Sequence, residues 1–256
     1  MIDIHCHILP GIDDGPQTIK QSLSIAESLV AKGYRQIIAT PHTRDGIFNV
    51  QSDSIYAKTI ELNQALQNLS VDLAIYPGAE YPLIPELLDS ELVTLNNSRY
   101  LLVELPFTQP VPQYAEDLFF QLQTKGLVPI LAHPERCRGI QENPDLVKEY
   151  ARLGVLLQVN IASIFGRYGR GVRQLAENFI KQGLIHFLAT DSHRPFKYDL
   201  EQLQQQLGKT SLDKYTAANP QAVLANSNDH ISPPLEDKPK ASFLNSISAV
   251  FRHRWH

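Results

Sequence analysis

Cysteine is scarce in this chain of 256 residues, which contains only Cys6 and Cys137. Two thiols are too few for a disulfide framework and are typical of proteins from a reducing compartment. No apolar run is long enough to cross a bilayer, and the first residues lack the basic, apolar and small-residue order of a secretory signal. We therefore expect a cytoplasmic protein without a transmembrane segment.

An excess of charge of one sign is also missing. Lys and Arg total 23, Asp and Glu total 27, and the formal net charge is -4. This balance lacks the positive charge that nucleic-acid binding requires, so we expect no nucleic-acid partner. Because 43% of the residues are hydrophobic, the composition is that of an ordinary globular protein that buries a sizeable core.

What the chain does contain is a repeated alternation of short apolar runs with helical patterns. Apolar residues recur at helical spacing over residues 17–33, 51–69, 113–125, 143–153 and 171–183. Together with the β-branched runs around them, these patterns give seven strand-plus-helix units of an α/β fold. Such an order predicts parallel strands joined by right-handed crossovers and favours closure into a barrel, with an open doubly wound sheet as the alternative.

The composition changes near the C-terminus. Residues 1–226 contain no linker and are expected to form one domain, whereas residues 227–256 begin with a polar, proline-containing stretch typical of a flexible tail. The final ASFLNSISAVFRHRWH places apolar residues near one face of a short amphipathic helix. This helix could contact a membrane surface, a partner or its own domain. We favour self-docking or disorder, because one short helix with few charges is a weak membrane anchor.

Imidazoles and carboxylates gather at the carboxyl ends of the predicted strands. They are His5, His7, His42, Glu80, Glu104, His133, Asp191 and His193. In barrels this face carries the active site. Each residue alone has a plain structural explanation, but together they would repel one another or stay unsatisfied unless cations bind there. A donor set without thiolates suits manganese, iron or zinc and exceeds what one ion needs, which predicts more than one metal.

His5 and His7 belong to the stretch HCHILPGIDDGP, which combines a predicted strand end with an aspartate-containing turn. On a strand His5 and His7 share one face, where they can bind one ion, while Cys6 points to the opposite face and is expected in the core. Asp13 and Asp14 follow in a turn and can reach back over the same mouth. A purely structural role as turn residues is an equal alternative for each of them.

The chain resembles the polymerase and histidinol phosphatase (PHP) family, and within it the bacterial manganese-dependent protein-tyrosine phosphatases of capsule and exopolysaccharide clusters. The resemblance rests on an ordered set of stretches: DIHCHILPGIDDGP, TPHTRDGIF, PGAEY, LVELPF, LAHPERC, ATDSH and NPQAVLAN. It implies a distorted (β/α)7 barrel with three divalent ions, Mn²⁺ first, with iron or zinc as alternatives. It also implies hydrolysis of phosphotyrosine on a protein such as a bacterial tyrosine autokinase that controls polysaccharide export.

The resemblance further implies roles for particular residues. The first ion would be held by His5, His7, Glu80 and Asp191. The second would share Glu80 and be completed by Glu104 and His133, and the third would be held by Asp14, His42 and His193. Arg136 would bind the substrate phosphate. These phosphatases carry a further arginine a few residues after the DxH pair, and here Arg194 or Lys197 of the stretch RPFKY could supply that charge.

The mechanism expected from these residues is attack of a metal-activated hydroxide on phosphorus. Arg136 would bind phosphoryl oxygens, and His42 or a metal-bound water could assist departure of the phenolate. One alternative is a PHP-type small-molecule phosphatase such as histidinol-phosphate phosphatase, with the same metals. Another is a non-catalytic metal-binding interaction protein, although every assigned position retains a residue able to coordinate.

Other catalytic motifs are missing or incomplete. Neither cysteine is followed six residues later by arginine, which argues strongly against a cysteine-based tyrosine phosphatase. The stretch GRYGRG at 166–171 lacks nucleotide-binding spacing and is expected to be a loop near the mouth, where Arg167 and Arg170 could approach an acidic substrate. His186 is expected away from the mouth. The sequence leaves the oligomeric state open.

Overall fold

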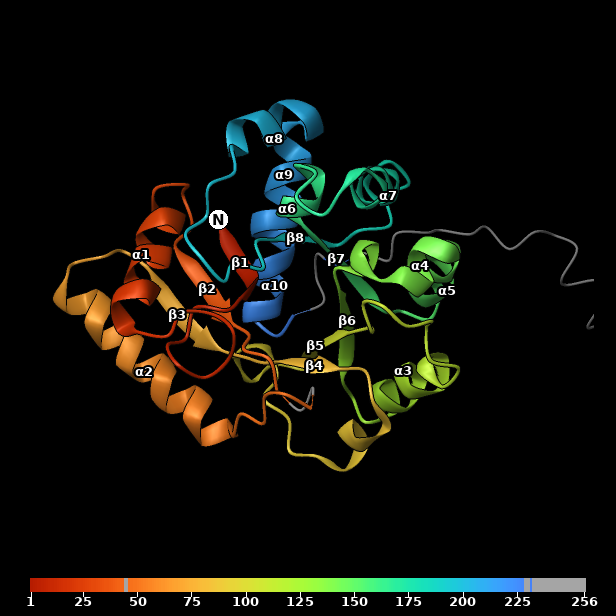
Figure 1. Ribbon diagram of the computed structural model, residues 1–256, viewed down its shortest axis with the longest axis horizontal. Coiled ribbons are helices and arrows are strands. Elements are labelled where there is room, and N and C mark those ends of the chain that lie inside the picture. Colours follow the sequence, from red (N-terminus) through yellow and green to blue (C-terminus); the bar gives the residue numbers. More distant parts are fainter. Residues whose placement is uncertain (44–45, 228–230, 232–256) are drawn as a thin grey trace, which may run out of the picture.

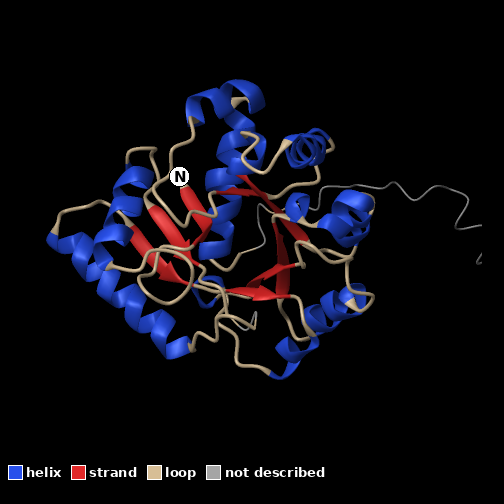
Figure 2. Cartoon of the chain, viewed as in Figure 1, coloured by secondary structure: helices blue, strands red, loops and turns tan. Residues whose placement is uncertain are grey.

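The computed structural model describes residues 1–43, 46–227 and 231. Within them, eight parallel strands surround a common centre, and helices lie outside the strands (Figures 1 and 2). One sheet contains β1 (Ile2–Cys6), β2 (Gln36–Ala39) and β3 (Ala74–Pro77). The other contains β4 (Glu80–Pro82), β5 (Tyr100–Glu104), β6 (Val128–Ala132), β7 (Leu156–Asn160) and β8 (Phe187–Ala189).

Two seams join the sheets into a distorted barrel. At the first seam β1 meets β8, where Cys6 bridges to Ser192 and the Asp191 N–H donates to the His5 carbonyl at 2.9 Å. At the second seam the end of β2 meets β4, where the Thr43 N–H donates to the Glu80 carbonyl at 3.1 Å. The α/β barrel expected from the sequence is therefore confirmed. The first seam joins the carboxyl ends of β1 and β8, and the second joins the carboxyl end of β2 to the first residue of β4.

One predicted strand is divided in two. The apolar run that ends at Glu80 forms β3, which pairs with β2, and then β4, which pairs with β5. Gly78 lies at the break, and a Cβ atom there would come within 2.8 Å of Ile38 Cγ2 and 3.1 Å of the Ala39 carbonyl oxygen. Only glycine permits this close approach, so the PG step marks a change of sheet rather than the interior of a strand.

Helices connect successive strands on the outside of the barrel. The α-helices are α1 (Ile19–Val30), α2 (Ser52–Asn68), α3 (Ala115–Thr124), α4 (Arg138–Glu142), α5 (Leu146–Arg152), α6 (Ile161–Ile164), α7 (Arg170–Lys181), α8 (Leu200–Leu207), α9 (Lys209–Asp213) and α10 (Asn219–Leu224). Short 3-10 turns occupy η1 (Pro85–Asp89), η2 (Leu95–Asn97) and η3 (Pro134–Arg136), and a π-helical turn occupies η4 (Lys214–Ala218). The five predicted helices are present, with the fourth shortened to α5.

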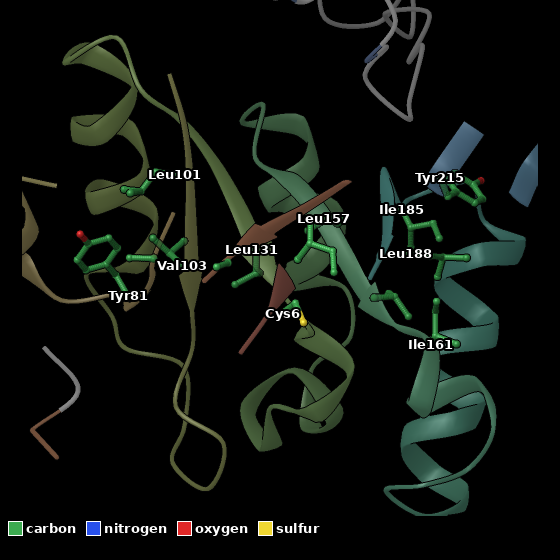
Figure 3. Packing of buried hydrophobic residues seen from close by; sticks show 14 of the residues in the cluster. Cys6, Tyr81, Leu101, Val103, Leu131, Leu157, Ile161, Ile185, Leu188 and Tyr215 are labelled. Carbon is green, nitrogen blue, oxygen red and sulfur yellow. The ribbon is translucent and has the colours of Figure 1, made fainter. Parts of the chain in front are cut away.

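Buried side chains form an inner and an outer apolar cluster. The inner one combines residues of β1, β2, β5, β6, β7 and β8, among them Ile38 and Leu102, and fills the space that the strands enclose. The outer one packs strands against helices and contains Leu131 and Leu157 (Figure 3). The Cys6 thiol lies in this outer cluster, fully buried, as the sequence predicted.

His186 lies just before β8, at the amino end of the barrel, and is buried. Its Nδ1 accepts a hydrogen bond from the Leu157 N–H at 3.0 Å. Burial, helped by the nearby Lys214 charge, lowers the pKa of His186 from 6.5 to about 3. The residue is thus a neutral structural histidine away from the mouth, in agreement with the sequence analysis.

The predicted tail helix lies outside the described residues. Within the described part of the chain, every helix is too short or too polar to span a membrane.

The close approach at Gly78 predicts the effect of a single methyl group. We expect Gly78→Ala to lower the free energy of unfolding by about 1–3 kcal/mol through overpacking. Gly171→Ala is the matched control: it lies in α7, where an added Cβ meets nothing within 4 Å, and it should stabilise the protein by up to about 1 kcal/mol. Chemical denaturation measures both changes, and equal effects would contradict the packing argument.

The low pKa of His186 predicts a pH dependence of stability. The unfolded chain takes up a proton near pH 6.5, whereas folded His186 does so only near pH 3, so acidification across this range favours unfolding. From pH 7 to pH 5.5 the wild type should therefore lose about 1 kcal/mol more unfolding free energy than a His186→Gln variant. Urea titrations at the two pH values measure the difference, and parallel losses would show that His186 titrates normally.

Candidate metal centre

The nine predicted ligands converge at the carboxyl ends of the strands. They fall into four overlapping groups whose nitrogen and oxygen atoms lie within 4.8 Å of one another. The groups are His7, Asp14, His42 and His193; His5, His7 and Glu80; His5, His133 and Asp191; and His42, Glu80 and Glu104. Each group mixes imidazole with carboxylate and so offers donor atoms that a divalent transition metal accepts.

An irregularity in β1 directs its histidines into the barrel. The register with β2 shifts between Asp3 and Cys6, and Ile4, between them, belongs to the inner apolar cluster. Such a bulge lets neighbouring residues face the same side of a sheet and is common beside active sites. His5 and His7, two residues apart, thus share the inner face, where their Nε2 atoms lie 3.2 Å apart and both side chains are fully buried.

The two aspartates of the IDDGP turn have different surroundings. Asp13 is buried, and its Oδ2 accepts a hydrogen bond from His7 Nδ1 at 2.7 Å, which orients that ring. Asp14 is more exposed, and its Oδ1 lies 3.1 Å from His193 Nε2. Gly15 lets the turn close, because a Cβ there would come within 2.5 Å of the His7 carbonyl oxygen. Of the two aspartates, Asp13 therefore has a structural role, because it orients His7, whereas Asp14 lies beside another proposed ligand.

Glu80 lies at the middle of the cluster and is completely buried. Its Oε2 is 3.2 Å from His5 Nε2 and 3.3 Å from His7 Nε2. The same oxygen is 3.1 Å from His42 Nδ1, while Oε1 is 2.9 Å from His133 Nε2. One carboxylate thus contacts four imidazoles from three different strand ends.

The crowding perturbs the titration of the cluster. Burial favours the neutral form of Glu80, but contacts with His5 and His133 outweigh it and hold the pKa of Glu80 well below its usual range. Burial and the nearby Glu80 charge raise the pKa of Glu104. Burial opposes a charge on His7, yet Asp13 and Glu80 raise the pKa of His7 well above 6.5. Protons on imidazoles and on Glu104 therefore reduce the net negative charge of the cluster. A bound metal cation would take over this role.

Several buried polar atoms of the cluster make no hydrogen bond within the described part of the chain. They are His42 Nδ1, Glu80 Oε2, Glu104 Oε2 and His133 Nδ1. Buried polar atoms normally have partners, and three of these four belong to one metal-ligand group. The donor set and its unpartnered atoms together fit divalent cations such as Mn²⁺, Fe²⁺ or Zn²⁺.

Two strand ends have an unusual backbone. His133 has φ 33° and Asp191 has φ 50°, in the left-handed region that residues other than glycine rarely occupy. Such conformations cost on the order of 1–3 kcal/mol and persist where the surroundings impose them. Here Asp191 Oδ2 accepts hydrogen bonds at 2.7 Å from Arg136 Nη1 and at 2.7 Å from Asn160 Nδ2. The left-handed turn brings the carboxylate into the cluster.

Arg136 is fixed beside the cluster by aromatic rings as well as by Asp191. Its guanidinium carbon lies 4.4 Å from the centre of the Phe107 ring and 4.2 Å from that of Tyr168. Neither aromatic residue was predicted to lie at the site. The only signal for Tyr168 was its place in the GRYGRG loop, which the structure brings to the mouth as expected.

An open pocket of about 570 Å³ leads to the cluster. Asp14, His42, His133 and Asp191 of the cluster line it, and so do the aromatic residues Phe107 and Tyr168. Four basic residues also line it: Arg136, Arg167, Arg194 and Lys197. Arg170, in contrast, begins α7 and is not among the lining residues, so only one of the two loop arginines considered from the sequence reaches the pocket.

The chain matches a family of bacterial proteins and a set of tyrosine phosphatases. The model of the family "Capsular polysaccharide synthesis, CpsB/CapC" matches residues 1–225. Tyrosine-protein phosphatase YwqE of Bacillus subtilis is 39% identical over 197 residues, which cover 75% of this chain and 77% of YwqE. Tyrosine-protein phosphatase CpsB of Streptococcus pneumoniae is 31% identical over 202 residues, which cover 75% of this chain and 83% of CpsB.

Solved structures agree with the sequence matches. Among the crystal structures of YwqE from Bacillus subtilis and CpsB from Streptococcus pneumoniae, described as unique metal-dependent tyrosine phosphatases, one chain superposes with a TM-score of 0.84. It is 35% identical, and the match covers 91% of this chain and 98% of that one. With its family match, its barrel and its cluster of imidazoles and carboxylates, this chain belongs to the CpsB/CapC family of capsular polysaccharide synthesis proteins.

Proposed function

We propose that this chain is a metal-dependent protein-tyrosine phosphatase that hydrolyses phosphotyrosine. The observation that carries the proposal is the convergence of nine imidazole and carboxylate ligands beside Arg136 in an open pocket. The names of the relatives YwqE and CpsB as tyrosine-protein phosphatases support the same activity.

In this proposal the nine residues hold three divalent ions, with Mn²⁺ as the first choice and iron or zinc as alternatives. One ion would lie between His5, His7, Glu80 and Asp191, a second between Glu80, Glu104 and His133, and a third between Asp14, His42 and His193. In support, the third set lies within one group of closely spaced donor atoms, and His5, His7 and Glu80 of the first set form another. For the second set, His133 Nε2 lies 2.9 Å from Glu80 Oε1 and 3.9 Å from Glu104 Oε2. When bound, such ions lower the pKa of water toward neutrality and stabilise negative charge on phosphoryl oxygens.

Arg136 is the proposed phosphate-binding residue. Its guanidinium has five N–H donors in one plane, more than its bond to Asp191 uses, and the remainder suit a phosphate. The rings of Phe107 and Tyr168 and the Asp191 bond fix the plane before substrate arrives. Donors that need no reorientation stabilise the charge of the transition state most effectively.

The side chain proposed to assist departure of the phenolate is His42, which is also a proposed metal ligand. It lines the pocket, and burial together with the His7 charge lowers the pKa of His42, which makes its protonated form a stronger acid toward the leaving phenolate. A phenol has a pKa near 10, so phenolate is already a fair leaving group and needs only modest assistance.

The pocket also favours an aromatic phosphate ester over a small polar one. Phe107 and Tyr168 line the pocket beside Arg136 and add apolar surface against which the phenyl ring of phosphotyrosine could pack. Arg194 lines the same pocket and is our candidate for the second phosphate contact. The capsule-synthesis family supports a bacterial tyrosine kinase of polysaccharide export as the phosphotyrosine protein.

The central test compares substrates and metals. Chelator-stripped protein with Mn²⁺ restored should hydrolyse a phosphotyrosine peptide, and the His5→Ala, His7→Ala double variant should lose at least about a thousandfold in kcat/KM. His186→Gln controls for the loss of a buried histidine and should retain activity. Turnover of histidinol phosphate alone would favour the small-molecule alternative, and metal-independent turnover would exclude the mechanism.

The second phosphate contact can be assigned by alanine substitution. Because a hydrogen bond to a charged group is worth about 1.5–3 kcal/mol, Arg194→Ala should reduce kcat/KM for phosphotyrosine peptide by about tenfold or more. Lys197→Ala, on the same pocket wall, is the matched control and should have a smaller effect. The reverse order would assign the contact to Lys197.

A further inference from the structure

Two buried amides on β7 connect ligands that come from different strands. Gln158 and Asn160 are two residues apart, so both side chains point into the barrel, and both are completely buried. Gln158 Oε1 lies 2.9 Å from His5 Nδ1, and Gln158 Nε2 donates to Asn160 Oδ1 at 2.8 Å. Asn160 Nδ2 donates to Asp191 Oδ2 at 2.7 Å. We call Gln158 and Asn160 the amide relay.

The chemistry of its two ends fixes the direction of every hydrogen bond in the relay. An ionised carboxylate accepts hydrogen bonds only, so Asn160 must present its NH₂ group to Asp191 and its oxygen to Gln158. Gln158 then donates through Nε2 and has only its oxygen left for His5. Because that oxygen accepts, Nδ1 of His5 must carry a hydrogen atom, and in the neutral ring Nε2 is the nitrogen with a free lone pair.

The same relay determines which oxygen of Asp191 remains available. Asn160 and Arg136 both donate to Oδ2. Oδ1 lies instead 3.5 Å from His5 Nε2 and 3.4 Å from His7 Nε2, inside the cluster. His5 Nε2 and Asp191 Oδ1 thereby both direct lone pairs into the cluster of proposed ligands. His5 does so from β1, and Asp191 from just beyond β8.

The relay is itself anchored. The Asn160 N–H donates to Glu135 Oε1 at 3.0 Å, and the Ser163 hydroxyl donates to the same oxygen at 2.7 Å. Glu135 is completely buried and precedes Arg136 in η3. The turn that carries the phosphate-binding arginine therefore also fixes the backbone from which Asn160 reaches Asp191.

We infer that Gln158 and Asn160 are positioning residues that hold His5 in the Nδ1–H form and turn Asp191 Oδ1 toward the metal centre. The inference rests on the proposed function in so far as the cluster binds divalent ions. A hydrogen-bond partner behind a ligand fixes its orientation and raises its basicity, and loss of such a partner typically weakens metal binding by about 10–100-fold.

The test is the affinity of chelator-stripped protein for Mn²⁺, measured by calorimetric titration. Gln158→Met keeps the shape of the side chain but removes the acceptor for His5, and it should weaken Mn²⁺ binding by about 10–100-fold. Gln158→Glu retains an acceptor oxygen opposite His5 but loses the donor to Asn160, so its Mn²⁺ affinity should fall between those of the wild type and the Met variant. Asn219→Leu is the matched control: it removes a buried amide that bonds to the His186 carbonyl at 2.7 Å and should leave Mn²⁺ affinity unchanged.

The outcomes separate this inference from the phosphatase proposal. Wild-type affinity in Gln158→Met, no difference between the Met and Glu variants, or equal weakening in Asn219→Leu would overturn the relay. A wild-type protein that binds no Mn²⁺ would overturn it too. Mn²⁺ affinities in the expected order from a protein that does not cleave phosphotyrosine would support the relay and reject the proposed function.

Discussion

The Glu80 carboxylate is buried among four imidazoles, and the arrangement of the rest of the structure depends on this contact. This carboxylate is completely buried, and it lies 2.9–3.3 Å from histidines of three strand ends. A buried carboxylate is stable only when positive charge compensates it. Protons on histidine can do so, and divalent ions do so better, since each carries two charges and accepts both imidazole and carboxylate donors.

Much of the local backbone serves to bring ligands to Glu80. β1 contains a register shift that turns His5 inward, and Gly78 lets the chain leave one sheet and enter the next just before Glu80. His133 and Asp191 adopt left-handed backbone conformations at the ends of their strands. These features each cost stability, and the extensive apolar clusters on both sides of the strands offset them.

The convergence of the proposed ligands could be predicted from the sequence because strand ends are easy to locate. An apolar run that stops at a histidine or carboxylate indicates both a strand and its functional end, as for His42 and Glu104. The division of the strand before Glu80 was not predicted, because the apolar run continues on both sides of Gly78. The contact of Asp13 with His7 and the role of Gln158 were not predicted, because a residue that acts through a second residue is recognisable only by the atoms it faces. Phe107 and Tyr168 meet across Arg136 from distant segments, a contact that no local pattern encodes.

The measurement that tests the central claim most directly is anomalous diffraction from crystals of the full chain grown with Mn²⁺. The account predicts manganese peaks among the nine imidazole and carboxylate residues, with Glu80 in contact with more than one ion. Crystals of an active phosphatase with no manganese peak at the barrel mouth would contradict it, because the buried carboxylates would then be balanced by protons alone.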